Sequence, residues 1–327
     1  MTARSRTALL AAAVVLLAAV AVVSVGVGAH GIAPAEVLRA IFGNGDPADQ
    51  AVVRDVRAPR ALLAVGVGAA LAVAGVLVQV LSRNPLAEPG VLGVTAGAGF
   101  AITIGSALGI AVSASGELLF AVLGAVLATL LVYAVGRRSP LRMVLTGTAL
   151  TFVLSGVSLG LRLLLPDTFD RYRFWAVGSL AGREQAPLTV PLVVIAVSVV
   201  AAFLLSRQLN ALALGDTVAH TLGARVARIR AGTLVLITLL AGAATAVAGP
   251  ILFVGLIVPH LARRAAGASV PWLTAFAVVL GPILLLVSDI GSRVLLPTGE
   301  VPVAIVTAFV GGPVLIWAVR KYGTAAL

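Results

Sequence analysis

Long apolar runs without charges constrain this chain more than any other feature. A helix that crosses the hydrocarbon core of a bilayer needs about 17 to 25 mainly apolar residues, because each residue rises about 1.5 Å through a core of about 30 Å. Eight runs lack Asp, Glu, Lys and Arg and meet this length: 8–29, 61–81, 90–116, 118–135, 143–161, 187–206, 271–288 and 302–319. With 60% hydrophobic and only 11% charged residues, the chain is predicted to be an all-α, polytopic membrane protein.

The stretch 231–262 is too long for one upright helix and is interrupted at Gly249-Pro250. Proline removes a backbone donor, so the stretch is either one kinked span or two spans, 231–248 and 250–262. Arginines flank it on both sides, and Arg and Lys are enriched in cytoplasmic loops, which favours two passes. The prediction is then a single domain, 1–327, with about ten spans, both termini in the cytoplasm and a cytoplasmic connection at 207–230. The run 8–29 exceeds the ~7 to 15 apolar residues of a signal peptide and is expected to be retained.

An internal similarity suggests that the two halves are related. The segment GAALAVAG at 68–75 nearly matches GAATAVAG at 242–249. Five spans separate the two segments, so they cross the membrane in opposite directions, as in inverted-repeat transporters. Chance similarity in an Ala- and Gly-rich chain, or small residues that simply let helices approach, are the alternatives.

Several function classes lack the residues that they need. There is no Cys, and the only Lys is Lys321, which follows no glycine-rich loop, so the chain has no phosphate loop of its own. The net charge of +11 is spread between apolar runs, which argues against a nucleic-acid partner. Neither His220 nor His260 has a second ligand at metal spacing, so no metal site and no catalytic residues are predicted. Asp289 has Arg293 four residues on, and an ion pair on one helix face is the simplest interpretation.

A series of short motifs follows in order along nearly the whole chain: RAPR at 57–60, GAALAVAG at 68–75, Gln79, RNPLAEPG at 83–90, Leu92-Gly93, Gly97-Ala98, WAVGSL at 175–180, Leu214-Gly215, Leu222-Gly223, FVGLIVPH at 253–260, Arg263, Asp289, Arg293, Pro297, Glu300, Pro302, Thr307, Gly311 and Pro313. This ordered series resembles the FecCD-type permeases of ABC importers for iron-siderophore complexes, haem and vitamin B12.

The resemblance implies a type II ABC importer. Its permease would pair with a second copy of itself or with a related permease, two cytoplasmic ATPase subunits and an extracytoplasmic binding protein, in the cell membrane and among its lipids, without a cofactor. The chelate would cross by alternating access driven by the ATPases, and the binding protein would set most of the selectivity.

The resemblance also suggests roles for individual residues. Docking of the binding protein is expected at Arg57, Arg60 and Arg293, whose guanidinium groups suit carboxylates. Coupling to the ATPase is expected in a short helix around Gly215, Asp216, Thr217, Ala219, His220, Leu222 and Gly223, which Asp216 or Thr217 can cap and Gly223 can end. Structural or translocation roles are expected for Asn84, Pro85, Gly93, Gly97, Pro259, His260, Asp289, Glu300 and Pro302. The candidate gate is Leu141, Arg142, Met143, Val144 and Leu145.

Two other transporter classes remain as alternatives. A secondary carrier driven by an ion gradient would need an intramembrane carboxylate, for which Asp289 is the only candidate. A zinc or manganese ABC permease is disfavoured because His and acidic residues are scarce in the spans. For Arg57 and Arg60 the alternative to docking is anchoring at lipid phosphates, and for Arg293 it is a structural pair with Asp289.

Overall fold

The chain is a bundle of α-helices. The computed structural model describes residues 2–28, 31–44, 46–111, 113–136, 139–183, 187–213, 215–221, 223–296 and 299–322, and these form helices and turns without a strand. The elements are α1 (Ala3–Gly26), α2 (Pro34–Ile41), α3 (Pro47–Ala51), a π-helical turn η1 (Val52–Arg57), α4 (Ala58–Ser82), a 3₁₀ turn η2 (Pro89–Leu92), α5 (Val94–Ala107), α6 (Ala114–Gly136), α7 (Pro140–Leu164), α8 (Pro166–Ala176), α9 (Thr189–Ala213), α10 (Asp216–Thr221), α11 (Val226–Ala248), α12 (Val254–Ala266), α13 (Val270–Val294) and α14 (Val303–Tyr322).

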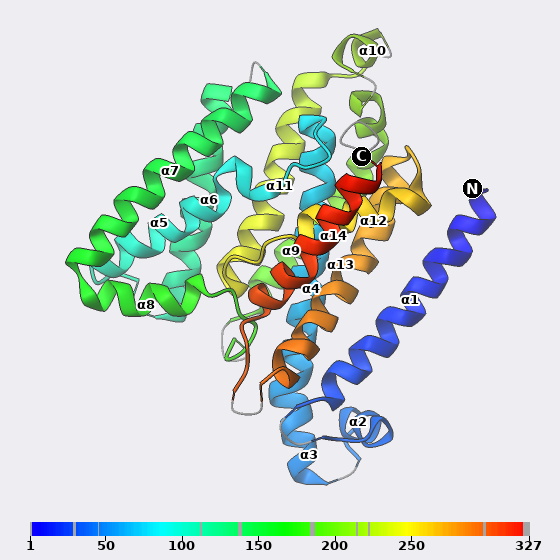
Figure 1. Ribbon diagram of the computed structural model, residues 1–327, viewed down its shortest axis with the longest axis vertical. Coiled ribbons are helices and arrows are strands. Elements are labelled where there is room, and N and C mark those ends of the chain that lie inside the picture. Colours follow the sequence, from blue (N-terminus) through cyan, green and yellow to red (C-terminus); the bar gives the residue numbers. More distant parts are fainter. Residues whose placement is uncertain are drawn as a thin grey trace.

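The long helices run between two ends of the molecule (Figure 1). The short helix α10 lies at one end, which we call the α10 end, and α2 and α3 lie at the opposite end, the α3 end. The first residues of α1 and the last residues of α14 both point toward the α10 end. Helix α4 runs toward the α10 end and α11 runs away from it, so the two similar segments, 68–75 and 242–249, are antiparallel as an inverted repeat requires.

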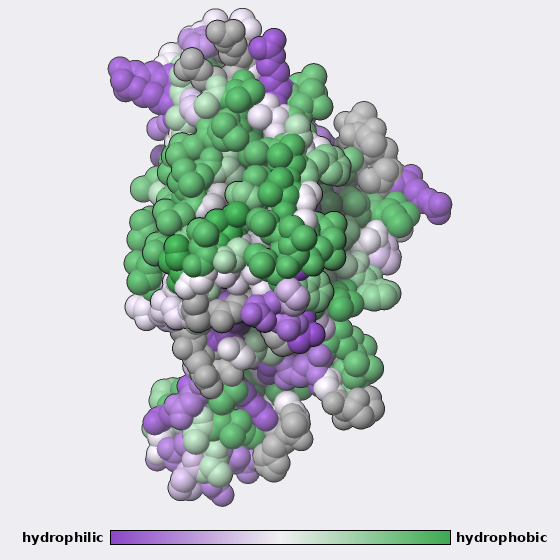
Figure 2. Space-filling view, turned by 90° about the vertical axis from the view of Figure 1, so that its left-hand side faces the viewer, coloured by the Kyte–Doolittle hydropathy of each residue, from purple (hydrophilic) through white to green (hydrophobic). Residues whose placement is uncertain are grey.

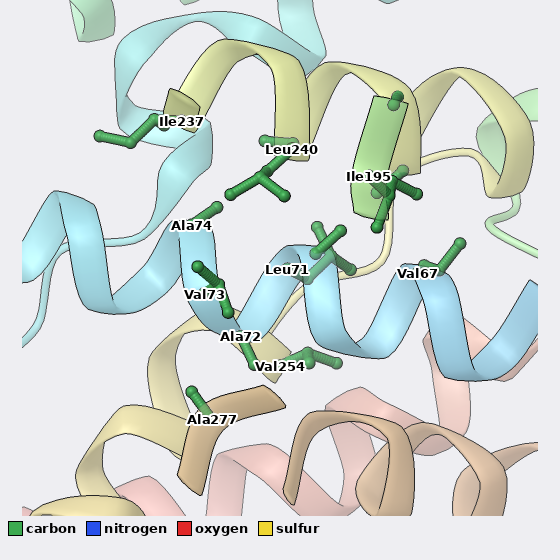
Figure 3. Packing of buried hydrophobic residues seen from close by; sticks show 14 of the residues in the cluster. Val67, Leu71, Ala72, Val73, Ala74, Ile195, Ile237, Leu240, Val254 and Ala277 are labelled. Carbon is green, nitrogen blue, oxygen red and sulfur yellow. The ribbon is translucent and has the colours of Figure 1, made fainter. Parts of the chain in front are cut away.

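Helices α4 and α11 form the centre of the bundle because their small residues let neighbours approach closely. One side of α4 carries Val67 and Leu71 toward Ile195 of α9 and Leu240 of α11 (Figure 3). Its other side carries Ala72 toward α12 and α13.

Three pairs of glycines bring helix backbones into contact. A Cβ on Gly68 would lie 2.7 Å from the Gly281 carbonyl oxygen, and one on Gly75 would overlap the carbonyl of Gly255. Gly97 and Gly124 bring α5 and α6 together in the same way. Such packing replaces the hydrophobic drive that helices lack in lipid.

The outer surface of the bundle is apolar over its middle. Figure 2 shows a hydrophobic band across one face, with hydrophilic residues gathered toward its two ends. Within the described residues, seven helices are long and apolar enough to cross a membrane: α1, the continuous segment Pro47–Ser82, α6, α7, α9, α11 and α13. Leucine and valine side chains that would be costly to expose to water, such as Leu127 at 65% and Leu204 at 75% exposure, instead suit contact with lipid. The prediction of an all-α, polytopic membrane protein is confirmed.

Two of the predicted spans are shorter helices than the sequence suggested. The run 90–116 contains η2 and α5, and α5 ends at Ala107 because Gly109 takes a left-handed conformation, φ +69°. The run 250–262 overlaps α12 (Val254–Ala266), whose 13 residues extend about 20 Å and cannot cross a core of about 30 Å alone. The remaining predicted runs each overlap one helix, and the ends differ by a few residues. In α14 the apolar part that can be judged, Val303–Trp317, is also shorter than a full span. The placement of the membrane around all ten stays a prediction.

Candidate functional site

At the α3 end, four charged side chains form what we call the ion-pair cluster: Arg60, Asp289, Arg293 and Glu300. Asp289 on α13 has no exposed surface, and its carboxylate accepts hydrogen bonds from Arg60 Nε at 3.1 Å and Nη2 at 2.8 Å. Arg293, one turn further along α13, donates to the other oxygen of Asp289. Arg60 also lies 2.8 Å from the half-exposed carboxylate of Glu300. Such a buried charge is tolerated because several donors surround it.

Arg293 of this cluster and the neighbouring Arg57 connect the end of α1 to the bundle. Arg57 donates to the carbonyl oxygens of Val25 and Gly26 at 3.1 and 2.9 Å. Arg293 donates to the carbonyl oxygens of Ser24 and Val27 at 2.7 and 3.0 Å. The last carbonyls of a helix have no partners within it and carry partial negative charge, so guanidinium groups stabilise this helix end.

The predicted docking arginines therefore have partners inside the subunit. Arg57 and Arg60 are buried, with 7% and 8% of their surface exposed, and Arg293 is held by Ser24, Val27 and Asp289. The expected pair of Arg293 with Asp289 is confirmed. Docking of a binding protein at these arginines stays a prediction, and a docking carboxylate would have to replace contacts that the arginines already make. Glu300 is the member of the cluster with substantial exposure, 43% of its side chain.

A second group of polar residues, which we call the polar cluster, joins α4 to α12. Gln79 donates to the carbonyl oxygens of Gly255 and Leu256 at 3.3 and 3.4 Å, and Arg263 Nη2 donates to Gln79 Oε1 at 2.7 Å. The amide nitrogen of Gln79 thus donates to carbonyl oxygens near the start of α12. Its amide oxygen accepts from Arg263, which lies further along the same helix. This arrangement fixes the position of a helix too short to span on its own.

Glu88 completes the polar cluster from the loop between α4 and η2. Its Oε1 accepts a hydrogen bond of 2.9 Å from the backbone N–H of Phe253, a residue in the left-handed conformation at φ 71° just before α12. The negative charge thus faces the positive end of the α12 dipole. Burial raises the pKa of the Glu88 carboxyl, and the hydrogen bond from Phe253 opposes that rise.

The predicted turn after α4 is confirmed. Arg83 ends α4 in the left-handed conformation, and the side chain of Asn84 accepts from the N–H of Leu86 at 2.9 Å, so Asn84-Pro85 reverse the chain. Gly93 then begins α5 with φ +76°. Gly97 packs against Gly124 of α6.

Three further residues predicted from motifs lie in or next to the helices α12 and α14. Pro259 is buried inside α12, and the half-buried His260 follows it. Pro302 immediately precedes α14, where a missing N–H costs least.

The predicted coupling segment forms the short helix α10, which Gly215 precedes and Gly223 follows with φ +109° and +77°. Thr217 and His220 are exposed, whereas Ala219 is fully buried and packs toward the bundle. Val218, which the motif comparison did not single out, is 42% exposed. Leu222 and the side chain of Asp216 lie outside the part of the chain that the structure describes.

The gate candidates lie at the first turns of α7, at the α10 end. Leu141 and Leu145 are exposed by 67% and 59%, and Arg142 is exposed as well. Met143 is buried against Gly136, and Val144 is half-buried. Only the exposed members of this group are free to meet another subunit or a solute.

Comparison with known proteins agrees with this architecture. Residues 14–321 match the model of the FecCD transport family. The chain belongs to the FecCD transport family.

Relatives at high identity are permease proteins of import systems. The chain is 45% identical over 311 residues to the ferric enterobactin transport system permease protein FepD of Escherichia coli K12, covering 94% of this chain and 93% of that protein. It is 37% identical to the Fe(3+) dicitrate permease FecC of the same organism, over 89% and 90% of the two chains. It is 36% identical to the hemin permease HmuU of Yersinia pestis, over 82% of each.

A solved structure shares the fold. A protein assigned to the metal-chelate type of ABC transporters, in an inward-facing conformation, superposes with a TM-score of 0.87 at 30% identity, covering 96% of this chain and 99% of that one. Like other FecCD family members, this chain is thus a multi-pass permease of an ABC transporter, the class to which its relatives for siderophores, haem and citrate belong.

Some contacts of this FecCD permease could not be read from motifs. Trp175 Nε1 donates to the Thr245 carbonyl oxygen at 3.2 Å and so ties the end of α8 to α11. Gly249 approaches the Trp175 carbonyl, and Gly178 approaches that of Pro250, where added Cβ atoms would collide. The motif WAVGSL signalled that this segment matters, but not which helix it packs against.

Proposed function

We propose that this chain is the permease subunit of an ATP-driven importer for an iron-siderophore complex. Two copies would surround the translocation path, two cytoplasmic ATPase subunits would drive alternating access, and an extracytoplasmic binding protein would deliver the chelate. The α10 end would face the cytoplasm, with both termini on that side. The observation that carries the proposal is the 45% identity over 94% of the chain to a ferric enterobactin permease, which spans both clusters and α10.

The exposed helix α10 supports coupling to a separate ATPase. It joins α9 to α11 at one end of the molecule, and Val218 presents an apolar side chain there. An apolar group on an otherwise polar cytoplasmic connection suits a pocket on a partner. Movement of α10 would pass directly into α11, which packs against the central helix α4.

The state of Asp289 argues against an ion-driven carrier. The two guanidinium groups of Arg60 and Arg293 bind its carboxylate. Its charge is therefore already compensated, and the carboxylate is not free to hold a transported cation. The alternative of a secondary carrier loses its only candidate residue.

The test is an uptake experiment with the chain, its ATPase and its binding protein expressed together in cells that lack their own siderophore permeases. Radioiron would be supplied as a catecholate, a hydroxamate or a citrate complex, and haem and cobalamin would be supplied as separate substrates. We expect saturable uptake of one iron-siderophore complex. Uptake of haem or cobalamin alone would contradict the proposed substrate class, and uptake of none would contradict the proposed function.

A further inference from the structure

An apolar groove runs between α6 and α11 on the outside of the bundle, and neither cluster nor α10 accounts for it. Its volume is about 260 Å³, more than the ~150 Å³ that accepts a benzene-sized molecule. Residues from both helices line it: Val126, Thr129 and Tyr133 of α6 and Ala231, Val235 and Thr238 of α11. A smaller hollow of about 130 Å³ shares Val126 and Thr238 and continues along α9.

The groove is apolar although two threonines line it. Thr129 Oγ1 donates to the carbonyl oxygen of Ala125, and Thr238 Oγ1 donates to that of Leu234, each on its own helix. Their methyl groups are left for the groove. The rim is apolar as well, since Leu130 and Val235 are more than half exposed. Apart from the Tyr133 hydroxyl, the lining offers few partners to an occupant with polar groups along its length.

Helices α6 and α11 approach each other closely beyond one end of the groove. There, a Cβ on Gly242 would lie 3.4 Å from Ala125, within ordinary contact distance. Toward the α10 end the small side chain of Ala231 leaves the space between the helices unfilled, and Tyr133 faces it across the groove. The space between the two helices is therefore lined by apolar side chains and is large enough for part of a hydrocarbon chain.

A positive charge lies at the α10 end of this groove. Arg228, Ala231, Val235 and Thr238 follow one another at spacings of three and four residues, so they share one face of α11. Arg228 is exposed, and it forms no ion pair within the part of the chain that the structure describes. Ten residues separate it from Thr238, or about 15 Å along the helix, which is the depth of one leaflet of a bilayer.

We infer that this groove binds one acyl chain of an inner-leaflet phospholipid whose anionic headgroup pairs with Arg228. The tyrosine at the same level suits the boundary between headgroups and hydrocarbon. Anionic lipids are attracted to arginines at the cytoplasmic surface. The inference rests on the proposed function only for the orientation that puts the α10 end in the cytoplasm. A lipid here would contact α11, the helix that follows α10 in the chain.

The test uses the full chain in phosphatidylethanolamine vesicles that contain a phospholipid probe with a photoreactive diazirine in its acyl chain. One set of vesicles contains the probe as phosphatidylglycerol and the other as phosphatidylcholine. We expect labelled peptides to come from 126–133 and 231–239, with about fivefold more labelling by phosphatidylglycerol, the factor expected for one arginine at an anionic headgroup. The readout requires no transport, so failure of the proposed function would leave it intact.

Matched variants separate this site from general contact with lipid. Arg228→Gln should remove the headgroup preference, while Arg4→Gln, an exposed arginine at the same end on α1, should keep it. Ala231→Phe should remove labelling of the groove, while Val200→Phe on the exposed face of α9 should not. Equal labelling of all apolar helices, or labelling unchanged by Ala231→Phe and Arg228→Gln, would overturn the inference. So would a protein–protein crosslink formed when a photoreactive amino acid replaces Val235, since the groove would then bind a second copy of the chain.

Discussion

Replacing Asp289 by Asn should destabilise the protein through the ion-pair cluster. The carboxylate is fully buried and binds Arg60 and Arg293. Removing one partner of a buried ion pair leaves an uncompensated charge and costs about 3 to 5 kcal/mol. Here Arg60 keeps Glu300 and Arg293 keeps the carbonyls at the end of α1. We therefore expect a loss near the lower end of that range, about 3 kcal/mol.

The free energy of unfolding can be measured by titrating the detergent-extracted protein with sodium dodecyl sulfate and following helix loss by circular dichroism. Glu300→Gln is the matched control, because it also removes a carboxylate that binds Arg60, but one that is 43% exposed. An exposed pair contributes about 0 to 1 kcal/mol. In a double-mutant cycle, Arg60→Met and Asp289→Asn should not be additive. The double variant should lose less unfolding free energy than the sum of the two single losses, and the difference should be at least about 0.5 kcal/mol, the lower limit for residues in contact.

The structural role of these arginines would be refuted by a simple result. If Asp289→Asn and Glu300→Gln unfold with the free energy of the wild type, the cluster does not stabilise the bundle. If Arg60→Met in addition loses only affinity for the binding protein, the docking role predicted from the motifs would replace it.

Four further results are expected. Gly75→Ala should lower the free energy of unfolding by about 1 to 3 kcal/mol, because its Cβ would overlap the Gly255 carbonyl. Gly156→Ala on α7, where the Cβ meets open space, should cost nothing, and equal effects of the two changes would contradict the packing. Burial raises the pKa of Glu88 in the folded state. Its contribution to stability is therefore fully present below about pH 4.3, the pKa of Glu in the unfolded chain, and is lost as the pH rises through the folded pKa. Glu88→Gln should flatten this part of the plot of stability against pH, and an unchanged plot would exclude Glu88 as its source. Val218→Glu should abolish co-purification of the ATPase subunit while Val56→Glu, equally exposed at the α3 end, leaves it intact; retention by both variants would count against α10 as the contact. The purified chain should bind no ATP in equilibrium dialysis, since its only lysine, Lys321, follows no glycine-rich loop, and saturable binding would disprove this.

The sequence predicted the long helices well, because membrane spans are specified by local composition. The runs 61–81 and 271–288 each lie within one helix, α4 and α13. The Gly and Asn-Pro positions were also informative, since the backbone conformations at Gly93 and Asn84-Pro85 are set by the residues themselves.

Shorter helices were predicted less well. Hydropathy alone does not distinguish a complete span from a short apolar helix such as α5 or α12 that packs inside the bundle. Helix α8 was not predicted, although Pro166 at its first turn and Asp167 beside it are helix-start signals. Its charged and aromatic residues are interspersed, so the segment forms no apolar run that would indicate a helix.

The arginine contacts show what the sequence could not provide. The pair of Asp289 and Arg293 is local, four residues apart, and was predicted. The second arginine that binds Asp289, Arg60, lies 229 residues away from it in the chain. The partners of Arg57 are backbone carbonyls at the end of α1, which no side-chain motif reveals. Exposure of an arginine, and hence its freedom to dock a partner, depends on these long-range contacts.

The source of energy for transport is the most direct test of the central claim that this chain is an ABC importer permease. Initial uptake of the radioiron-siderophore complex would be measured in cells that express the chain, its binding protein and its ATPase, with either a wild-type ATPase or one whose phosphate-loop lysine is replaced. We predict that uptake is lost with the inactive ATPase and persists when an uncoupler collapses the proton gradient while ATP is maintained. Uptake that survives with the inactive ATPase and stops with the uncoupler would contradict the account and identify a secondary carrier.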